Sequence, residues 1–267
     1  MSVCQAAKVE EIQKKLADIP PERNFRARAV LLNDLGTQLY KEGRWDEAIE
    51  AFDNALTYGP PTVLKRHIHL YLGKSYESSG RMDKAITSYE QAALFDKRNW
   101  RRHRDVAGLY EKAHLIEKAI GSYEKALRYN PKESSVHFAL GRLDRRLARY
   151  EQAEKHFLAA LDYGQNQNDV FAELSLVFEA QGKFSEAASS ANEVTGDDAP
   201  AADWARLAYL SILGRQDDLI AKSFAGLKKK GVSEETIRFY EALKRYIGAN
   251  PSQEDARFAA QLKDILK

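Results

Sequence analysis

Histidines, one cysteine and clustered arginines are the residues of this 267-residue chain whose types could do chemistry. His67 and His69 are two residues apart, so on a helix their rings diverge and make a poor metal pair. The single cysteine, Cys4, rules out an internal disulfide and a multi-cysteine metal site. The sequence also has neither a glycine-rich phosphate loop nor a nucleophile elbow. We therefore predict a chain that is not an enzyme, with no cofactor and no metal site.

A basic run follows Trp100 and would suit phosphate groups. Arg101, Arg102 and Arg104 offer phosphate contacts, and the indole offers a surface on which bases stack. Against this stand the interspersed Asp105 and a formal net charge of only +2 for the whole chain. RNA binding by a basic helical repeat is therefore the alternative function, and nucleic acid is not the expected partner.

The composition favours a helical protein. Hydrophobic residues make up 44% and charged residues 30% of the chain, with only 7 prolines to break helices. No apolar run reaches the ~18 residues that a membrane span requires, and charges interrupt the first sixteen residues, so a signal-peptide core is missing. We expect the cytoplasm as the location. A periplasmic or secreted location stays open, because removal of a signal would leave the same sequence.

The elements that position these residues repeat along the chain. Five alanines lie 37, 34, 34 and 34 residues apart by subtraction of their positions: Ala48, Ala85, Ala119, Ala153 and Ala187. Twelve residues before each stands a small residue: Gly36, Gly73, Ala107, Gly141 and Ser175. Four residues after the first four alanines stands an aromatic one: Phe52, Tyr89, Tyr123 and Phe157. Such a period predicts stacked supersecondary units.

Each unit is predicted to be two antiparallel helices, A and B, joined by a short turn. The small residue lets helix B approach helix A closely, and the aromatic residue shares a face of helix B with the alanine four positions earlier. Gly43, Gly80 and Gly182 are expected to end helix A in the left-handed conformation.

These columns resemble the tetratricopeptide repeat family. The resemblance implies an all-α, right-handed superhelical solenoid of helix-turn-helix repeats with terminal capping helices. We divide the chain into an N-terminal amphipathic helix and linker (1–28), about six repeats (29–231) and a C-terminal capping helical pair (232–267). The sixth repeat is degenerate: Trp204, Ala208 and Gly214 fit, whereas Ile220 replaces the alanine of helix B. Asp144 replaces an aromatic residue of the fourth repeat, and we interpret it as repeat drift.

The resemblance implies that helix A of every unit lines a concave groove. The candidate partner-binding residues at these positions are His67, Tyr71, Lys74, Arg101, Arg104, Phe138, Arg142, Arg145 and Arg146. They make the middle of the groove basic, and the fifth unit turns acidic with Glu173. We therefore predict a protein-interaction scaffold or adaptor whose partner is a protein or peptide with an acidic segment gripped by arginines.

One subset of the family binds the C-terminal carboxylates of chaperones through fixed lysine, asparagine and arginine residues. The corresponding positions here hold Asn33, Thr37, Tyr71, Arg101 and Asp105. Only Arg101 is of the required type. The sequence thus gives no support for this chaperone-binding function.

Overall fold

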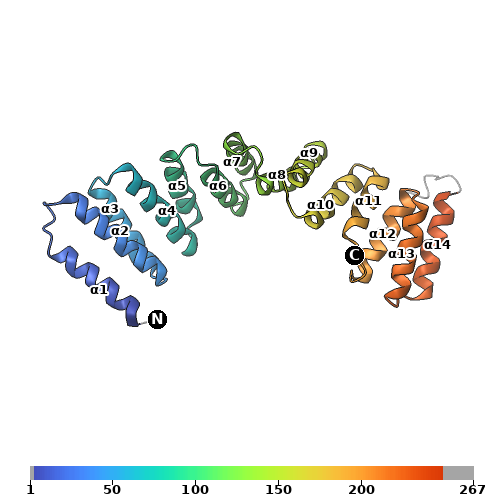
Figure 1. Ribbon diagram of the computed structural model, residues 1–267, viewed down its shortest axis with the longest axis horizontal. Coiled ribbons are helices and arrows are strands. Elements are labelled where there is room, and N and C mark those ends of the chain that lie inside the picture. The colour runs from blue at the N-terminus through green and yellow to red at the C-terminus, as the bar shows by residue number, and fades with distance from the viewer. Residues whose placement is uncertain (1–2, 249–267) are drawn as a thin grey trace. The chain divides into compact units, whose positions relative to one another are not determined.

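The computed structural model describes residues 3–248, and the chain divides into two compact units, the first ending at Lys132 and the second beginning at Glu133 (Figure 1). The described residues contain fourteen α-helices and no strand, as the sequence predicts. The first unit holds α1 (Val3–Ala17), α2 (Phe25–Lys41), α3 (Trp45–Thr57), α4 (Thr62–Ser78), α5 (Met82–Leu94), α6 (Trp100–Lys112) and α7 (Ile116–Tyr129). The second holds α8 (Ser134–Arg146), α9 (Tyr150–Asp162), α10 (Gln167–Ala180), α11 (Phe184–Val194), α12 (Ala201–Leu213), α13 (Asp217–Lys229) and α14 (Glu234–Gly248).

Three helix hairpins build the first unit, and each even-numbered helix from α2 to α6 is the A helix of its repeat. Before them lies α1, whose Val9 and Leu16 are buried in one core cluster with Leu32 and Leu35 of α2. Arg28 of α2 also donates a hydrogen bond to the carbonyl oxygen of Leu16, 3.1 Å away. Helix α1 therefore covers the first repeat.

Three further hairpins, α8–α9, α10–α11 and α12–α13, build the second unit, and α14 packs against α12 and α13. Ile237, Tyr240 and Leu243 of α14 are buried. The second helix of the predicted C-terminal pair falls outside the described residues.

The small residue of helix A meets the aromatic ring of helix B. A Cβ atom at Gly36 would lie 2.8 Å from the Phe52 ring, and one at Gly141 would lie 2.7 Å from the Phe157 ring. Both rings are fully buried. The sequence predicted a close approach at this column, and the structure shows that the aromatic ring, rather than the alanine, fills the space over the glycine.

The turn between helices A and B places one residue in the left-handed region in every repeat. Gly43, Gly80 and Gly182 have φ of 75°, 76° and 72°, which confirms their predicted role. In the other three repeats the same position, two residues before helix B, is held by residues with a side chain: His114, Ala148 and Arg215.

The turn of the sixth repeat is set by Arg215 and not by the neighbouring glycine. Gly214 has φ of −78°, whereas Arg215 has φ of 55° and holds the left-handed position. Ile220 then stands at the alanine position, and Phe224 at the aromatic position, packed against the core of the second unit. This repeat is one residue shorter than its neighbours.

Candidate functional site

A recess of about 360 Å³ lies between the A helices α4 and α6 of the first unit. Its walls come from residues one helical turn apart on each helix: Leu70, Lys74 and Glu77 on α4, and Arg102, Asp105, Leu109 and Lys112 on α6. One of these, Lys74, is a candidate groove residue from the sequence, and the others lie on the same helices as the candidates of α4 and α6. Successive A helices therefore bring part of the predicted groove together in one recess.

The charges of this recess are largely paired with one another. The Nζ atom of Lys112 lies 2.6 Å from Oε1 of Glu77, and Arg102 lies 3.7 Å from Asp105. Tyr89 of α5 donates a hydrogen bond of 3.3 Å to the other oxygen of Glu77. Burial, and then the neighbouring Glu77 carboxylate, raise the pKa of the Tyr89 phenol, so it stays a donor at neutral pH.

The three candidates of α4 form a line of contacts above this recess. His67 and Tyr71 have ring centroids 4.6 Å apart, and the Lys74 ammonium lies 4.8 Å from the centre of the Tyr71 ring. The Nδ1 atom of His67 lies 2.8 Å from Oδ1 of Asn33 on α2. Burial lowers the pKa of His67, and this effect exceeds the opposing influence of Asp34. The lowered pKa favours the neutral imidazole, which contacts both Asn33 and Tyr71.

Arg101 and Arg104 both lie close to Trp100. Their guanidinium carbons are 4.6 Å and 5.3 Å from the indole centre, within the range of cation–π contacts. Arg104 also contacts Asp105, with Nη2 2.9 Å from Oδ1. The indole that would serve as a stacking platform for RNA bases is thus already in contact with two arginines of its own helix.

In the second unit, the arginines of α8 meet an acidic residue of the next A helix. Arg142 and Arg145 lie 3.7 Å and 2.7 Å from the carboxylate of Glu173 on α10. Arg146 is exposed and makes no ion pair within the described part of the chain. Phe138 packs against Phe157 with ring centroids 5.6 Å apart, which makes it mainly a core residue.

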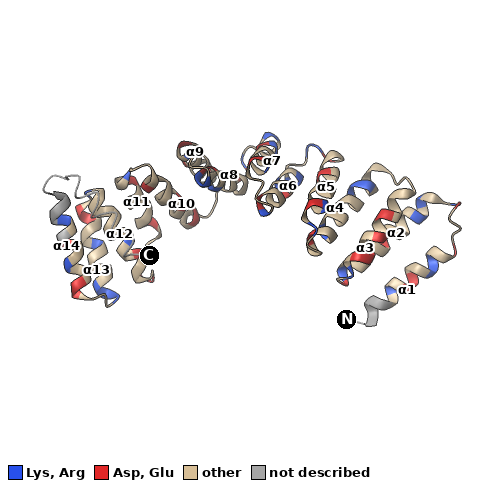
Figure 2. Ribbon diagram, turned by 180° about the vertical axis from the view of Figure 1, so that it is seen from behind, with Lys and Arg blue, Asp and Glu red and all other residues tan. Residues whose placement is uncertain are grey.

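Acidic side chains therefore lie among the basic ones along the helices of both units (Figure 2). The sequence predicted a basic centre and a separate acidic end, whereas Glu173 lies beside the arginines and neutralises two of them. Among the five candidate arginines, Arg101 and Arg146 lack an ion pair within residues 3–248. Arg102 lines the recess although it is not among the candidate residues.

Three histidines occupy one repeated column that we overlooked in the sequence. His69, His103 and His137 are spaced 34 residues apart and lie against three aromatic residues with the same spacing, Phe95, Tyr129 and Tyr163. The first two pairs are stacked, at interplanar angles of 19° and 14°. The equal spacing was the signal that could have revealed this column, since we interpreted His103 and His137 as unrelated surface or packing residues.

Asp144, interpreted as repeat drift, is buried among polar side chains. Its carboxylate lies 3.7 Å from Nε2 of His156 and 3.8 Å from Arg149. His156 in turn lies 3.3 Å from His137, nitrogen to nitrogen. Burial and the neighbouring His137 lower the pKa of His156. The fourth repeat has thus replaced an aromatic contact by a polar cluster.

Comparison with known families gives the repeats their name. A model of the tetratricopeptide repeat matches residues 33–101, 109–169 and 138–203, which together cover more than half of the chain. The chain belongs to the tetratricopeptide repeat family. Comparison with curated protein sequences finds no match.

Several solved structures share the tetratricopeptide repeat fold of this chain. The C-terminal part of a TPR repeat-containing protein from Cytophaga hutchinsonii is 16% identical, with a TM-score of 0.67 over 88% of this chain and 93% of its own. The MamA protein is 18% identical, with a TM-score of 0.56 over 62% of this chain and 90% of its own. PilF of Pseudomonas aeruginosa is 19% identical, with a TM-score of 0.51 over 81% of this chain and 97% of its own. At these identities the likeness shows the fold alone.

Within the described residues, no group of three or more histidine, cysteine, aspartate or glutamate side chains is arranged to hold a metal ion. None of the helices between residues 3 and 248 is both long and apolar enough to cross a membrane.

Proposed function

We propose that this tetratricopeptide repeat protein is a non-catalytic adaptor that holds an extended segment of a partner protein between α4 and α6. Repeats of this family generally mediate protein–protein interaction, and their stacked units offer long concave surfaces. The observation that carries the proposal is the recess formed where groove positions of two successive A helices meet. Leu70 and Leu109 give it apolar walls, and charged side chains surround them.

The charges of the recess favour a segment that carries carboxylates. The side chains of Lys112 and Glu77 are 62% and 30% exposed, and ion pairs of such exposure contribute only about 0–1 kcal/mol. A carboxylate of the partner can therefore replace Glu77 or Asp105 at little cost. Lys74 lies over the face of Tyr71, makes no ion pair within residues 3–248, and offers a further cation. In the second unit, Arg142 and Arg146 offer the same chemistry from α8.

A photo-cross-linking experiment tests where a partner binds. Benzoylphenylalanine replaces Lys74 in the recess or, in a control, the exposed Lys155 on α9, and each protein is irradiated in native lysate. We expect specific adducts from position 74 and none of the same mass from position 155. Adducts of equal identity and yield at both positions would contradict the proposed site.

Charge reversal tests how the partner is held. We expect Lys74→Glu with Arg102→Glu to reduce capture of the cross-linked partner about tenfold, because each charge-assisted contact becomes a repulsion. Arg142→Glu with Arg146→Glu tests the second unit separately, and Lys155→Glu with Lys228→Glu is the control of equal charge change. A loss in the control as large as that in the recess variant would indicate unspecific charge attraction.

A further inference from the structure

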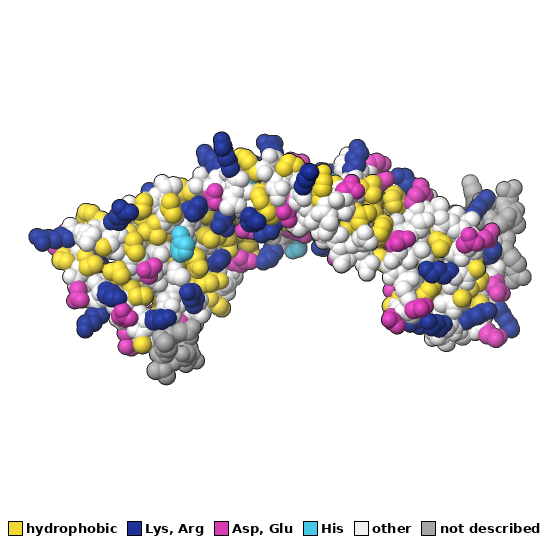
Figure 3. Space-filling model, in the orientation of Figure 1, with side chains coloured by type: hydrophobic (Ala, Val, Ile, Leu, Met, Phe, Trp, Pro, Cys, Tyr) yellow, Lys and Arg dark blue, Asp and Glu magenta, His cyan; other side chains and the backbone are white. Residues whose placement is uncertain are grey.

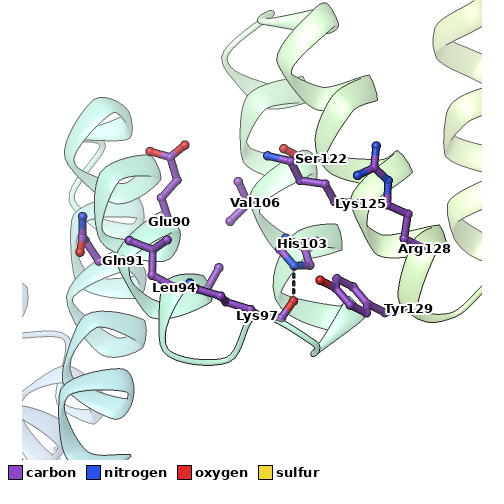
Figure 4. A pocket seen from close by; sticks show the side chains of 11 residues that line it. Glu90, Gln91, Leu94, Lys97, His103, Val106, Ser122, Lys125, Arg128 and Tyr129 are labelled. Carbon is purple, nitrogen blue, oxygen red and sulfur yellow. Dashed lines mark hydrogen bonds between the residues drawn. The ribbon is translucent and has the colours of Figure 1, made fainter. Parts of the chain in front are cut away.

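A second recess of the first unit lies away from the A-helix groove, between the B helices α5 and α7. It has a volume of about 530 Å³, and α6 forms its floor (Figure 4). Figure 4 shows Leu94 on the α5 side, Val106 on the floor, and Lys125, Arg128 and Tyr129 on the α7 side. The residues that line it are thus distinct from those that line the recess between α4 and α6.

The centre of this recess is apolar and partly open to solvent. Leu94 is 55% exposed although it lies beside the buried Val106. Tyr129, which is 48% exposed, stacks on His103 with ring centroids 5.6 Å apart. A ring nitrogen of His103 lies 2.8 Å from the carbonyl oxygen of Lys97, so the imidazole is fixed in orientation. Apolar side chains appear between basic ones over the first unit in the space-filling view as well (Figure 3). An apolar side chain from outside could therefore be buried against Leu94, Val106 and Tyr129.

The rim of the recess is basic and its cations are unpaired. Lys97, Lys125 and Arg128 line it, and none of them has a carboxylate partner within the described part of the chain. The acidic residue at the rim, Glu90, accepts a hydrogen bond from the hydroxyl of Tyr110. The A-helix recess differs in this respect, because there Lys112 and Arg102 are paired with Glu77 and Asp105.

We propose that the recess between α5 and α7 is a second binding site, for a peptide segment that carries an apolar side chain next to carboxylates. The apolar side chain occupies the space over Leu94 and Val106. The neighbouring carboxylates contact Lys125 and Arg128, which have no competing partner to release. Both parts are required: the apolar contact removes exposed surface from water, and the charges select acidic flanks.

Binding of three labelled peptides to the full chain tests both parts. The probe is Asp-Glu-Leu-Phe-Asp-Glu, and its two controls replace either the four acids by their amides or the Leu-Phe pair by Ser-Ser. Fluorescence polarisation should show that only the probe binds and that each control is about tenfold weaker. Methyl NMR signals of Leu94 and Val106 should shift with the probe. No binding of the probe, or binding without shifts at these methyl groups, would overturn the proposal.

Variants separate this site from the groove and from general attraction between charges. Lys125→Glu with Arg128→Glu, and Leu94→Ser alone, should each weaken the probe about tenfold while the helical circular dichroism signal stays unchanged. The groove variant Lys74→Glu with Arg102→Glu should bind the probe as the parent does, as should the control Lys155→Glu with Lys228→Glu. If the Ser-Ser peptide or an RNA oligonucleotide of equal charge bound as tightly as the probe, the recess would be a general polyanion surface, and the proposal would be wrong.

Discussion

At the scale of single residues, backbone strain in the turns is the clearest departure from an ideal repeat. Ala148 has φ of 57° at a position where three other repeats have glycine. The left-handed region costs a residue with a Cβ atom roughly 1–2 kcal/mol of folding free energy. Glycine avoids this cost, but its greater freedom in the unfolded chain offsets part of the advantage. Such turns can therefore be improved without touching the core.

We expect Ala148→Gly to stabilise the protein by about 0.5–1 kcal/mol, the difference between those two effects. The reverse change at the matched position, Gly182→Ala with φ of 72°, should destabilise it by a similar amount. The midpoint of urea unfolding, followed by circular dichroism, measures both. Equal midpoints for the two variants would show that the turn conformation adapts to its residue.

His69 gives the stability a dependence on pH. Burial, and then the nearby Lys65, lower its pKa below the ordinary value of 6.5, so the folded state binds this proton less readily than the unfolded chain does. Below pH 6.5 the unfolded state binds more protons at this histidine than the folded state does, so the free energy of unfolding falls as the pH falls. Nδ1 of His69 has no hydrogen-bond partner within the described residues, so no hydrogen bond at this atom would stabilise the protonated ring.

The melting temperature of the parent should therefore drop between about pH 7.5 and about pH 5.5, the range in which histidines titrate. His69→Gln should make this drop smaller, because the depressed group is gone. His114→Asn, at an exposed histidine, is the control and should retain the parent's slope. A slope in His69→Gln equal to that of the parent would assign the effect to other groups, among them His67 and His156, whose pKa values are also lowered by burial.

At the scale of helix pairs, glycines inside helices have opposite roles according to what they face. Gly141 lies under the buried ring of Phe157, whereas Gly121 of α7 has open space where a Cβ atom would stand. Alanine is favoured over glycine in a helix interior by about 1 kcal/mol. The same substitution is thus expected to change stability in opposite directions at the two sites.

Gly121→Ala should stabilise the protein by about 0.5–1 kcal/mol through helix propensity. Gly141→Ala should destabilise it by about 1–3 kcal/mol, because the ring must move from its packed position. Adding Phe157→Leu to Gly141→Ala should recover part of the loss. Thermal or chemical unfolding measures the change in stability of each variant. Stabilisation by both alanine substitutions would mean that the Phe157 ring is free to shift.

At the scale of the whole chain, the repeats determine how far the destabilisation caused by a local defect extends. Stacked repeats couple chiefly to their neighbours, so unfolding free energy is distributed along the array. Ala119 in α7 is fully buried. We expect Ala119→Trp to speed amide hydrogen exchange in α6 and α7, with no change in α12 and α13 of the second unit. Mass spectrometry of peptides from both units measures this, and a uniform increase would indicate one cooperative structure.

Much of the fold was predictable because repetition supplies several independent copies of each signal. The alanine, glycine and aromatic columns fixed the register of five repeats from sequence alone. The sixth repeat matches the columns less well: Ile220 does stand at the alanine position, but the left-handed residue of its turn is Arg215 and not the neighbouring Gly214. The length of the turn determines which residue adopts the left-handed conformation, and it overrides the intrinsic preference of glycine for that conformation.

The functional surface was less predictable, because charge depends on which helices become neighbours. Glu173 and Arg145 are 28 residues apart, and only the packing of α10 beside α8 pairs them. The recess between α5 and α7 escaped the sequence analysis for the same reason, since its lining residues come from three helices and the connection between α5 and α6.

Helix α6 lines both of the recesses proposed as binding sites. Arg102 and Asp105 of α6 face the A-helix recess, while the adjacent His103 and Val106 face the recess between α5 and α7. A ligand in one recess that shifts the position of α6 would alter the affinity of the other recess for its own ligand. Thermodynamic linkage then requires that the second ligand alter the affinity of the protein for the first by the same factor. An adaptor built in this way can make the capture of one partner conditional on the presence of another, with no catalytic step and no moving domain.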